Sequence, residues 1–547
     1  MIDVEYTLTR FKAIKNSRST WESHWEEIAE RVLPRQTGFT GSSGSQTKGE
    51  KKTQKVFDSK PMIALDRFAA VMDSMLTPRQ TKWHNLKSTN PELNKNFEVQ
   101  DWFYQVNNIL FGARYAPKAN YAGQNHERWT SLGAFGTGAM YTDFESGTGL
   151  RYRTVNLKNI YILENHQGVI DTVFREFEYT PRQAIQKWGK ERLPEKLLKA
   201  AESPRQQEDK FTFIHVVAPR EDFNPERADA KGKPWSSYYI SLDSKDLVTP
   251  EGGYNSFPYS ISRYVTAPDE IYGRSPAMMA LPDIKMLNEM GKTDIRAVHK
   301  LIDPPILLHD DGIMGGGMKI NMKPGGLTMG GVSRDGRQLI QPFGTGARAD
   351  ISETKMDQRR QSIDDAFLVT LFQILVDTPR MTATEALIRA QEKGMLLTPT
   401  MGRQQSEAIG PQIERELDLL MTHRMLPPVP DILVEAGGDY EIIYDSPMSR
   451  MQRAEELVGV QRTMELLAPF ANIDPTILDV FNKDELARLT AEVSGVPTPI
   501  LYSPDDVKGI RQQRAQAEQQ AQMVQSAQPL AGAMKDAAQA QHILTGG

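Results

Sequence analysis

The feature that most constrains this chain is the stretch Leu281–Val376, where two helical patterns flank a glycine-rich insert. The first pattern starts near Pro282 and must end at Asp303, because Pro304 and Pro305 cannot continue a helix. The second runs from about Ser352. Its apolar face recurs at four-residue steps: Ile363, Phe367, Leu371 and Leu375. The sequence therefore predicts two long helices that carry a different module between them.

The insert, residues 303–351, has no helical periodicity. Repeated glycines separate short apolar runs there, such as Pro305–Leu308 and Leu339–Phe343. Such composition is typical of turns and strands. We expect a small β-rich module; the alternative is a disordered lid without a partner.

Bulk composition excludes several classes of protein. The chain has 547 residues, enough for several domains, with 39% hydrophobic and 25% charged residues. It contains no cysteine, which excludes disulfides and thiolate chemistry. No apolar run approaches the roughly 20 residues that span a bilayer. The net charge of −5 argues against a surface that grips DNA everywhere.

The N-terminal part is predicted to be helical. Residues 4–33 are expected to form one amphipathic helix, and further helices are expected at 60–76, 98–112 and 119–132. The Gly/Ser/Lys-rich stretch Gln36–Lys55 between them is expected to be a mobile loop. Its lysines are interpreted as a solvated run, with a nucleic-acid patch as the alternative.

Residues 139–267 are mostly strand-like. The stretch Gly133–Met140 lacks the Lys-Ser/Thr ending of a phosphate-binding loop, so we interpret it as a tight turn into a strand. A capping box at Thr180–Gln183 predicts one intervening helix. The predicted strands are Met140–Phe144, Tyr152–Leu157, Ile160–Leu163, Val169–Phe177, Phe211–Ala218 and Tyr238–Leu242.

Beyond the central stretch the chain is again mainly helical. An apolar, proline-containing break at Met395–Gly402 precedes a helix predicted at Gln404–Leu426. Residues 440–444 are a lone strand that could pair with the earlier sheet. From Ser449 the pattern is helical, and the Gln/Ala-rich Gly509–Gln541 fits a polar helix or a partly disordered tail equally well.

The sequence gives little support for an enzyme. It has no His-Glu-x-x-His, Gly-x-Ser-x-Gly, dinucleotide-binding or EF-hand pattern. No histidines pair at metal-ligand spacing, and His309-Asp310-Asp311 is better explained by a turn. We therefore expect no catalytic residues, no metal and no cofactor.

A series of individually weak motifs occurs in one order along the chain to about residue 430. They are Trp21–Arg35, Leu76–Trp83, Leu132–Phe144, Val169–Gln183, Tyr272–Asn288, Asp303–Ile306 and Met381–Arg389. Together they resemble the portal (head-to-tail connector) proteins of podovirus-type bacteriophages. Another structural virion protein, of the tail or internal core, is the first alternative. A packaging ATPase is the second, and the missing phosphate-binding loop argues against it.

The resemblance implies a mainly helical α+β fold assembled as a ring, usually of twelve copies, at the portal vertex of the capsid. Double-stranded DNA would pass through the ring during packaging and ejection. The implied partners are the terminase motor, a tail adaptor, and capsid and scaffolding proteins, with no membrane. Assembly would take place in the host cytoplasm and the finished protein would belong to the virion.

The resemblance also implies a division of the chain. The implied regions are a wing (1–281), a first stem helix (282–302), a clip (303–351), a second stem helix (352–376), a channel-proximal segment with a kinked helix and return to the wing (377–448), and a helical crown with its tail (449–547).

Two groups of basic residues are candidates for function. Arg389, Lys393 and Arg403 flank apolar Met395–Thr400 and are expected near the channel, with intersubunit ion pairs as an equal alternative. Partner docking is expected of the clip, whose basic residues are Lys319, Lys323, Arg334, Arg337 and Arg348.

Overall fold

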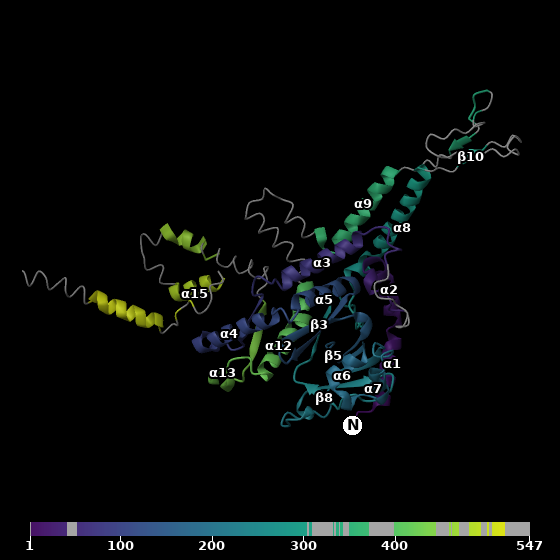
Figure 1. Ribbon diagram of the computed structural model, residues 1–547. Helices are drawn as coiled ribbons and strands as arrows, with labels where there is room; N and C mark the ends of the chain where they lie inside the picture. The colour runs from purple at the N-terminus through teal and green to yellow at the C-terminus, as the bar shows by residue number, and fades with distance from the viewer. Residues whose placement is uncertain are drawn as a thin grey trace, which may run out of the picture. The chain divides into compact units, whose positions relative to one another are not determined.

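The computed structural model describes most of the first 444 residues and parts of the remainder. The described residues are 2–40, 52–302, 306–308, 332, 335–338, 340–342, 349–370, 399–444, 459–460, 462–469, 481–493, 500, 502 and 506–519. They form two compact units, which we describe separately. Unit 1 comprises Met1–Trp83 and Leu110–Met425, and unit 2 comprises His84–Ile109 and Leu426–Gly547. Helices and sheets both contribute, as predicted (Figure 1).

The N-terminal helix is broken in two, so the prediction of one helix over residues 4–33 was wrong. Helix α1 spans Val4–Ser17 and α2 spans Ser19–Val32. Between them Arg18 is buried, and its guanidinium donates to the carbonyl oxygens of Leu157 (3.1 Å) and Ile160 (2.6 Å). These bonds satisfy backbone groups at the edge of a sheet, which a continuous helix pattern does not reveal.

The next helices match their predictions closely. They are α3 (Lys60–Leu76), α4 (Phe97–Arg114) and α5 (Tyr121–Phe135). Helix α5 ends at Gly136, whose φ of +78° suits a glycine after a helix, and β2 (Thr137–Glu145) follows at once. The interpretation of Gly133–Met140 as a tight turn into a strand is confirmed.

Two antiparallel sheets follow. The first has the order β3-β2-β9, with β3 at Gly149–Val155 and β9 at Tyr259–Arg263. The second has the order β4-β5-β6-β7-β8, in which neighbours in sequence are neighbours in space. Its strands are β4 (Ile160–Glu164), β5 (Ile170–Tyr179), β6 (Phe211–Pro219), β7 (Trp235–Ser241) and β8 (Gly252–Tyr254). These bounds confirm the predicted strand-rich region.

Side chains alternate between the two faces of the five-stranded sheet along each strand, so both faces carry apolar residues. Helices cover both of these faces. Phe11 of α1 packs on one face with Phe174 and Ile214. The other face, with Phe177 and Phe213, is covered by α6 (Pro181–Trp188) and α7 (Glu195–Glu202). Helix α6 begins with the predicted capping box. Short 3-10 turns lie at Pro34–Gln36, Leu93–Lys95, Leu157–Asn159, Lys190–Arg192 and Ala230–Gly232.

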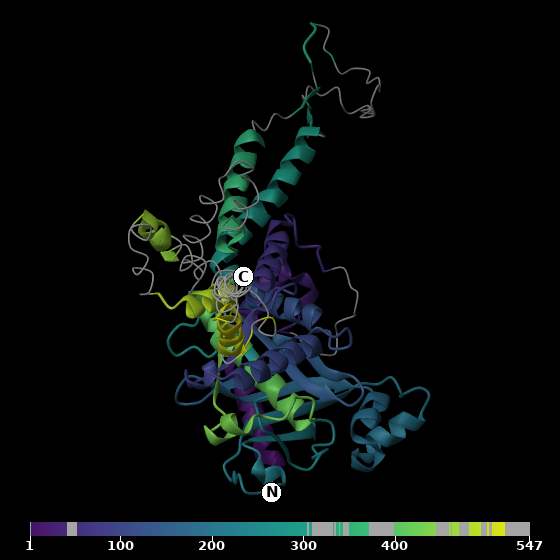
Figure 2. The ribbon, with the colours of Figure 1, turned by 90° about the vertical axis from the view of Figure 1, so that its left-hand side faces the viewer.

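The central helices α8 (Pro276–Ile302) and α9 (Ala349–Ala366) run side by side in both ribbon views (Figures 1 and 2). A short antiparallel pair lies beyond their far ends, formed by β10 (Ile306–Leu308) and β11 (Ile340–Pro342). Most of the remaining predicted clip lies outside the described residues.

The predicted start of the first central helix and the predicted end of the second both need correction. Helix α8 begins at Pro276 rather than near Pro282, because the Ser275 hydroxyl accepts a hydrogen bond from the Met278 amide (3.0 Å) and caps the earlier start. Helix α9 ends at Ala366, where the chain turns and Leu368 adopts a φ of +61°. Its predicted course to residue 376 is therefore interrupted, and residues 371–376 lie outside the described part.

The helix predicted at Gln404–Leu426 is irregular. Residues 399–404 are helical, Gln405–Ile409 form a π-helical turn, and α12 (Gly410–Thr422) continues from it. The helix ends four residues before the predicted Leu426. A π turn holds one extra residue, and such turns often mark functional positions.

Unit 2 contains the strand predicted at 440–444. This strand, β12 (Tyr440–Tyr444), pairs antiparallel with β1 (His84–Ser88), so the expected pairing with the sheets of residues 139–267 was wrong. Helix α13 (Asp431–Glu435) precedes it, and α15 (Lys483–Val493) lies in the C-terminal part. Residues 462–469 and 506–519 are also helical. Most of the rest of the predicted crown is outside the described residues.

Candidate functional site

Only two of the predicted functional residues lie in the described part of the chain. Arg337 is exposed in a turn of the insert, and Arg403 lies at the start of the irregular helix. The others lie outside the described residues: Arg389, Lys393, Lys319, Lys323, Arg334 and Arg348. The candidate site is therefore built from the two anchors that flank residues 371–398, the segment that carries Arg389 and Lys393.

The first anchor is the end of α9. Phe367 is fully buried, and its ring centroid lies 6.4 Å from that of Phe68 on α3 in an edge-on arrangement. The turn at Leu368 is closed by a hydrogen bond from its amide to the Asp365 carbonyl (3.0 Å). This anchor therefore fixes the chain direction just before residue 371.

The second anchor begins next to the same aromatic ring. Tyr264 lies 5.8 Å from Phe68 between ring centroids, and the Thr400 side chain lies near enough to its hydroxyl to lower the pKa of that phenol. Burial is the larger effect, so the pKa of Tyr264 is raised overall. Both ends of the intervening segment are thus tied to the core around Phe68, although they are separated by almost thirty residues.

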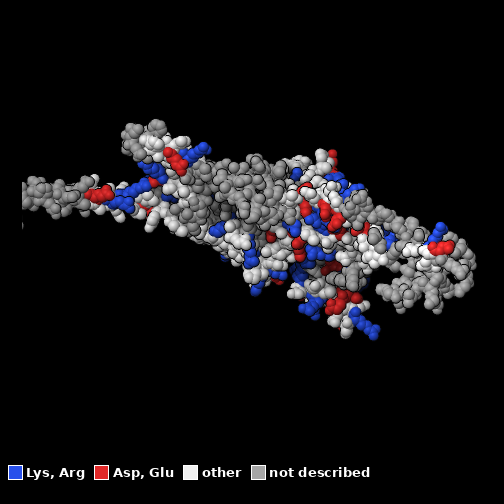
Figure 3. All heavy atoms as spheres, turned by 90° about the horizontal axis from the view of Figure 1, so that it is seen from above, with Lys and Arg blue, Asp and Glu red and all other residues white. Residues whose placement is uncertain are grey.

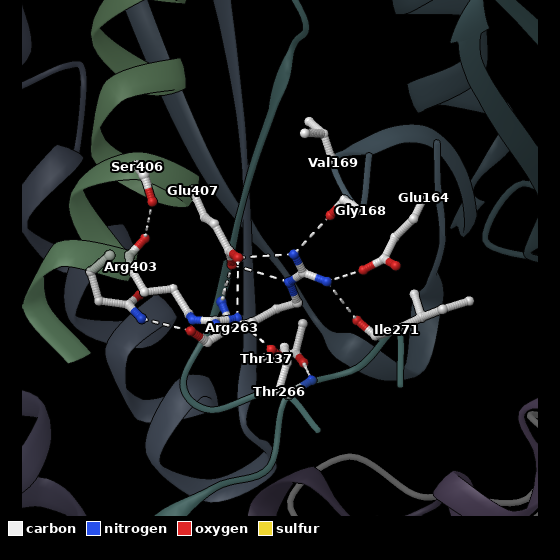
Figure 4. Close-up of polar contacts among 12 residues, drawn as sticks. Thr137, Glu164, Gly168, Val169, Arg263, Thr266, Ile271, Arg403, Ser406 and Glu407 are labelled. Atoms are coloured by element: carbon white, nitrogen blue, oxygen red, sulfur yellow. Dashed lines mark hydrogen bonds and ion pairs between the residues drawn. The ribbon is translucent and has the colours of Figure 1, made fainter. Parts of the chain in front are cut away.

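An arginine clamp holds the second anchor to the sheet (Figure 4). Arg263, at the end of β9, donates from Nη2 to Glu407 Oε1 (2.8 Å) and from Nε to Glu407 Oε2 (3.1 Å). Its other terminal nitrogen pairs with Glu164 of β4. Burial disfavours the charged guanidinium, but Glu407 and Glu164 outweigh that effect and raise the pKa of Arg263. The clamp therefore joins both sheets to the π turn.

Arg403 shares this network. Its guanidinium donates to the Thr266 hydroxyl (2.5 Å) and lies 3.4 Å from Glu407 Oε1. Gln404, fully buried, donates its amide to the Arg263 carbonyl oxygen (2.7 Å). The charge of Arg403 is thus partly offset within the chain, and the intrachain partner is one that sequence analysis did not predict.

A buried ion pair fixes α12 farther along. Arg114 at the end of α4 donates to Glu416 from Nε (3.0 Å) and Nη2 (2.5 Å), and both side chains are 0% exposed. Tyr152 of β3 and Gln412 also donate to Glu416, at 2.7 and 2.8 Å. Burial works against the charge of Arg114, but Glu416 more than compensates and raises its pKa. Burial, together with the smaller effect of the same carboxylate, raises the pKa of Tyr152 well above its usual value.

The two anchors, the arginine clamp and the buried ion pair can position residues 371–398, and they offer few groups for catalysis. In the described residues no group of three or more histidine, aspartate or glutamate side chains could hold a metal ion. None of the helices described is both long and apolar enough to cross a membrane. The glutamates of the clamp and of the ion pair are occupied by arginines, which leaves them as structural anchors.

Sequence comparison connects the chain with a family of phage proteins. The family described as "Bacteriophage head to tail connecting protein" matches residues 5–501. A probable portal protein of Bordetella phage BPP-1 is 28% identical over 520 residues, which cover 94% of this chain and 92% of that protein. The portal protein of Salmonella phage epsilon15 is 27% identical over 549 residues, covering 98% and 96%.

Solved structures show a weaker likeness. A chain from the virion of a native gene transfer agent particle has a TM-score of 0.37 at 12% identity, covering 85% of this chain and 99% of that one. A chain from the neck of an empty gene transfer agent particle has a TM-score of 0.36 at 11% identity, covering 78% and 96%. Both scores are too low to support an argument about the fold.

Proposed function

This chain belongs to the bacteriophage head to tail connecting proteins, and from that premise we propose that copies of it form the ring at the portal vertex through which double-stranded DNA is packaged and ejected. The observation that carries the proposal is the family match over residues 5–501, nearly the whole chain. The match favours a portal over a tail or internal core protein. The two curated relatives are themselves called portal proteins, and each aligns over more than nine-tenths of its length.

The charge distribution supports a conduit. On the face drawn in Figure 3, lysines and arginines are interspersed with aspartates and glutamates. A surface of mixed sign neutralises few phosphates, so it releases few counterions and binds DNA weakly. With a net charge of −5, the chain is suited to letting DNA slide.

The purified protein tests this function directly. We expect its native mass and electron micrographs to show rings with a central hole, with twelve copies as the proposed number. Because the homologues are structural proteins, we also propose that the rings turn over neither ATP nor DNA. Monomers at assembly concentrations, or ATP hydrolysis abolished by a point mutation in this chain, would contradict the proposal.

The regions keep the roles that we proposed from the sequence. We propose that residues 1–281 form most of the wing, that α8 and α9 form the stem, and that residues 449–547 form the crown. The side-by-side arrangement of α8 and α9 and the short β-pair beyond them support a stem that carries a clip.

We propose that the clip, residues 303–351, docks the terminase motor and the tail adaptor in turn. Its basic residues, such as Arg337, are nearly balanced by acidic ones, which favours contacts that can be released. We expect rings in which 310–337 are replaced by a short Gly/Ser linker to assemble but to lose motor and adaptor binding in pull-down assays.

A matched control replaces the exposed residues 221–229, in the β6–β7 connection, by the same linker. That variant should keep both partners. Binding of motor and adaptor at wild-type strength by the 310–337 variant would show that the clip is not the docking module.

We further propose that Arg389, Lys393 and Arg403 lie near the channel, where Glu407 partly offsets the charge of Arg403. In a chain without cysteine, a single cysteine at 389 or 393 can carry a photo-crosslinker. We expect crosslinks to DNA in filled particles from these positions, and none from a cysteine at exposed Lys199 on α7. Equal crosslinking from all three would contradict the placement.

A further inference from the structure

Residues 52–60, here called the strap, cross from α2 to the base of the α8–α9 pair. We propose that the strap is a positioning device that sets the direction in which these two helices extend from the rest of unit 1. The inference rests on the proposed function only in that the helices carry the module proposed for docking. The contacts themselves are independent of what that module binds.

Two hydrogen bonds join the strap to α8, and the side chain of one α8 residue makes both. The Asn288 side chain accepts from the Phe57 amide (2.8 Å) through Oδ1 and donates to the Lys55 carbonyl (3.0 Å) through Nδ2. One amide side chain thus satisfies a donor and an acceptor of the strap backbone, as a neighbouring strand would. The Lys292 ammonium lies 5.9 Å from the Phe57 ring centroid, which adds a weak contact.

The same strap is paired with α9. Asp58, 10% exposed, accepts from Nε (3.1 Å) and Nη2 (2.9 Å) of Arg360. Lys60, at the start of α3, forms an ion pair with Asp364. These half-buried charge pairs bind α9 to the segment that already holds α8, so the strap fixes both helices together.

The base of the strap is itself held by α2. Lys55 pairs with Glu30 (2.7 Å), and Lys285 of α8 pairs with Glu27 (2.7 Å). The two helices also have a direct link to each other, the ion pair of Arg359 with Asp283 (2.9 Å). The strap therefore connects the two helices to α2, which the direct link between α8 and α9 cannot do.

Beyond the residues that contact the strap, the apolar side chains of α8 are less buried. Ile295, Val298 and Ile302 are 44%, 38% and 78% exposed, whereas Ile284 and Leu287 are buried. The eleven residues that follow Gly291 to the end of α8 extend about 16 Å at the rise of an α-helix. A tilt of about 10° at the strap would move that end by roughly 3 Å. Small changes in the strap are thus amplified at the insert.

Hydrogen exchange measured by mass spectrometry tests the proposal on assembled protein. We expect Asn288→Ala to speed exchange about tenfold in residues 289–302 and in the first half of α9, while α5 and β2 keep their rates. Arg274→Gln is the matched control, because it breaks an exposed ion pair with Glu270 away from the strap. Unchanged exchange in α8 and α9, or equally faster exchange throughout, would overturn the proposal.

A second experiment fastens the strap covalently. A Cβ added to Gly291 would lie 3.7 Å from the Cβ of Phe57, close to the usual separation in a disulfide. In this cysteine-free chain, Phe57→Cys with Gly291→Cys should form one disulfide when a mild oxidant removes the two thiol hydrogens. The bond should return exchange in the Asn288→Ala background to the wild-type rate, and reduction should reverse the effect.

Failure of the disulfide to form, or to slow exchange, would contradict the placement of the strap. Neither outcome depends on rings docking a partner. If exchange behaves as expected but the 310–337 replacement still binds motor and adaptor, the strap stands and the docking role fails. The reverse pair of results would leave the docking role and remove the strap.

Discussion

We expect Glu416→Ala to destabilise unit 1 by about 3–5 kcal/mol, since removing one member of a buried ion pair leaves the other charge uncompensated. Arg114 would remain fully buried without its carboxylate, and the Tyr152 hydroxyl would lose its acceptor. Urea unfolding followed by tryptophan fluorescence measures the loss, because Trp83 lies under the Arg114 guanidinium at 4.5 Å.

Two further variants serve as comparisons: one keeps the shape of residue 416 without its charge, and the other removes an exposed ion pair. Glu416→Gln keeps the volume and some hydrogen bonds, so its loss should be smaller than that of the alanine variant. Glu195→Ala on α7 removes a pair whose side chains are 81% and 72% exposed, and should change stability by less than about 1 kcal/mol. If Glu416→Ala costs no more than Glu195→Ala, the buried pair does not hold α12.

The sequence predicted elements well where the deciding interactions are local. Helix α3 was predicted at its observed bounds because its apolar residues follow one helical stripe. The capping box of α6 and the tight turn from α5 into β2 are also short-range signals, and both are confirmed. The mixed helix and sheet composition follows from such local patterns.

The errors arose where distant residues decide. The break at Arg18 depends on carbonyl groups about 140 positions away, at Leu157 and Ile160. The partner of β12 is β1, a strand that the pattern of residues 84–88 did not reveal. Periodicity in one segment carries no information about such partners, since it reports only which face is apolar.

The candidate site shows the same division. Arg403 was predicted from its place beside an apolar break, but its partner Glu407 and the clamp residue Arg263 were missed. Arg263 and Glu407 are 144 residues apart, and nothing near either one marks the pair. The buried Glu416 was also missed, because a charged residue within a helix pattern is normally assigned to the solvent face.

We expect Gly136→Ala to be nearly as damaging as the loss of Glu416, at roughly 2–5 kcal/mol, because two penalties add. The φ of +78° is unfavourable for any residue with a Cβ. A Cβ at this position would also lie 2.2 Å from the Gly273 carbonyl oxygen, far inside contact distance. The backbone around Gly136, before β2, and around Gly273, before α8, would have to move apart. Urea unfolding should measure the resulting loss of stability.

Gly147 separates the two penalties. Its φ is +82°, and no heavy atom lies within 4 Å of where its Cβ would be, so Gly147→Ala measures the conformational cost alone. We expect that variant to lose about 1–2 kcal/mol. The excess loss in Gly136→Ala then measures the close approach of Gly136 and Gly273, where the turn after α5 meets the segment that leads into α8. Equal losses in the two variants would mean that the backbone relaxes freely there, and that the start of α8 is not held by this contact.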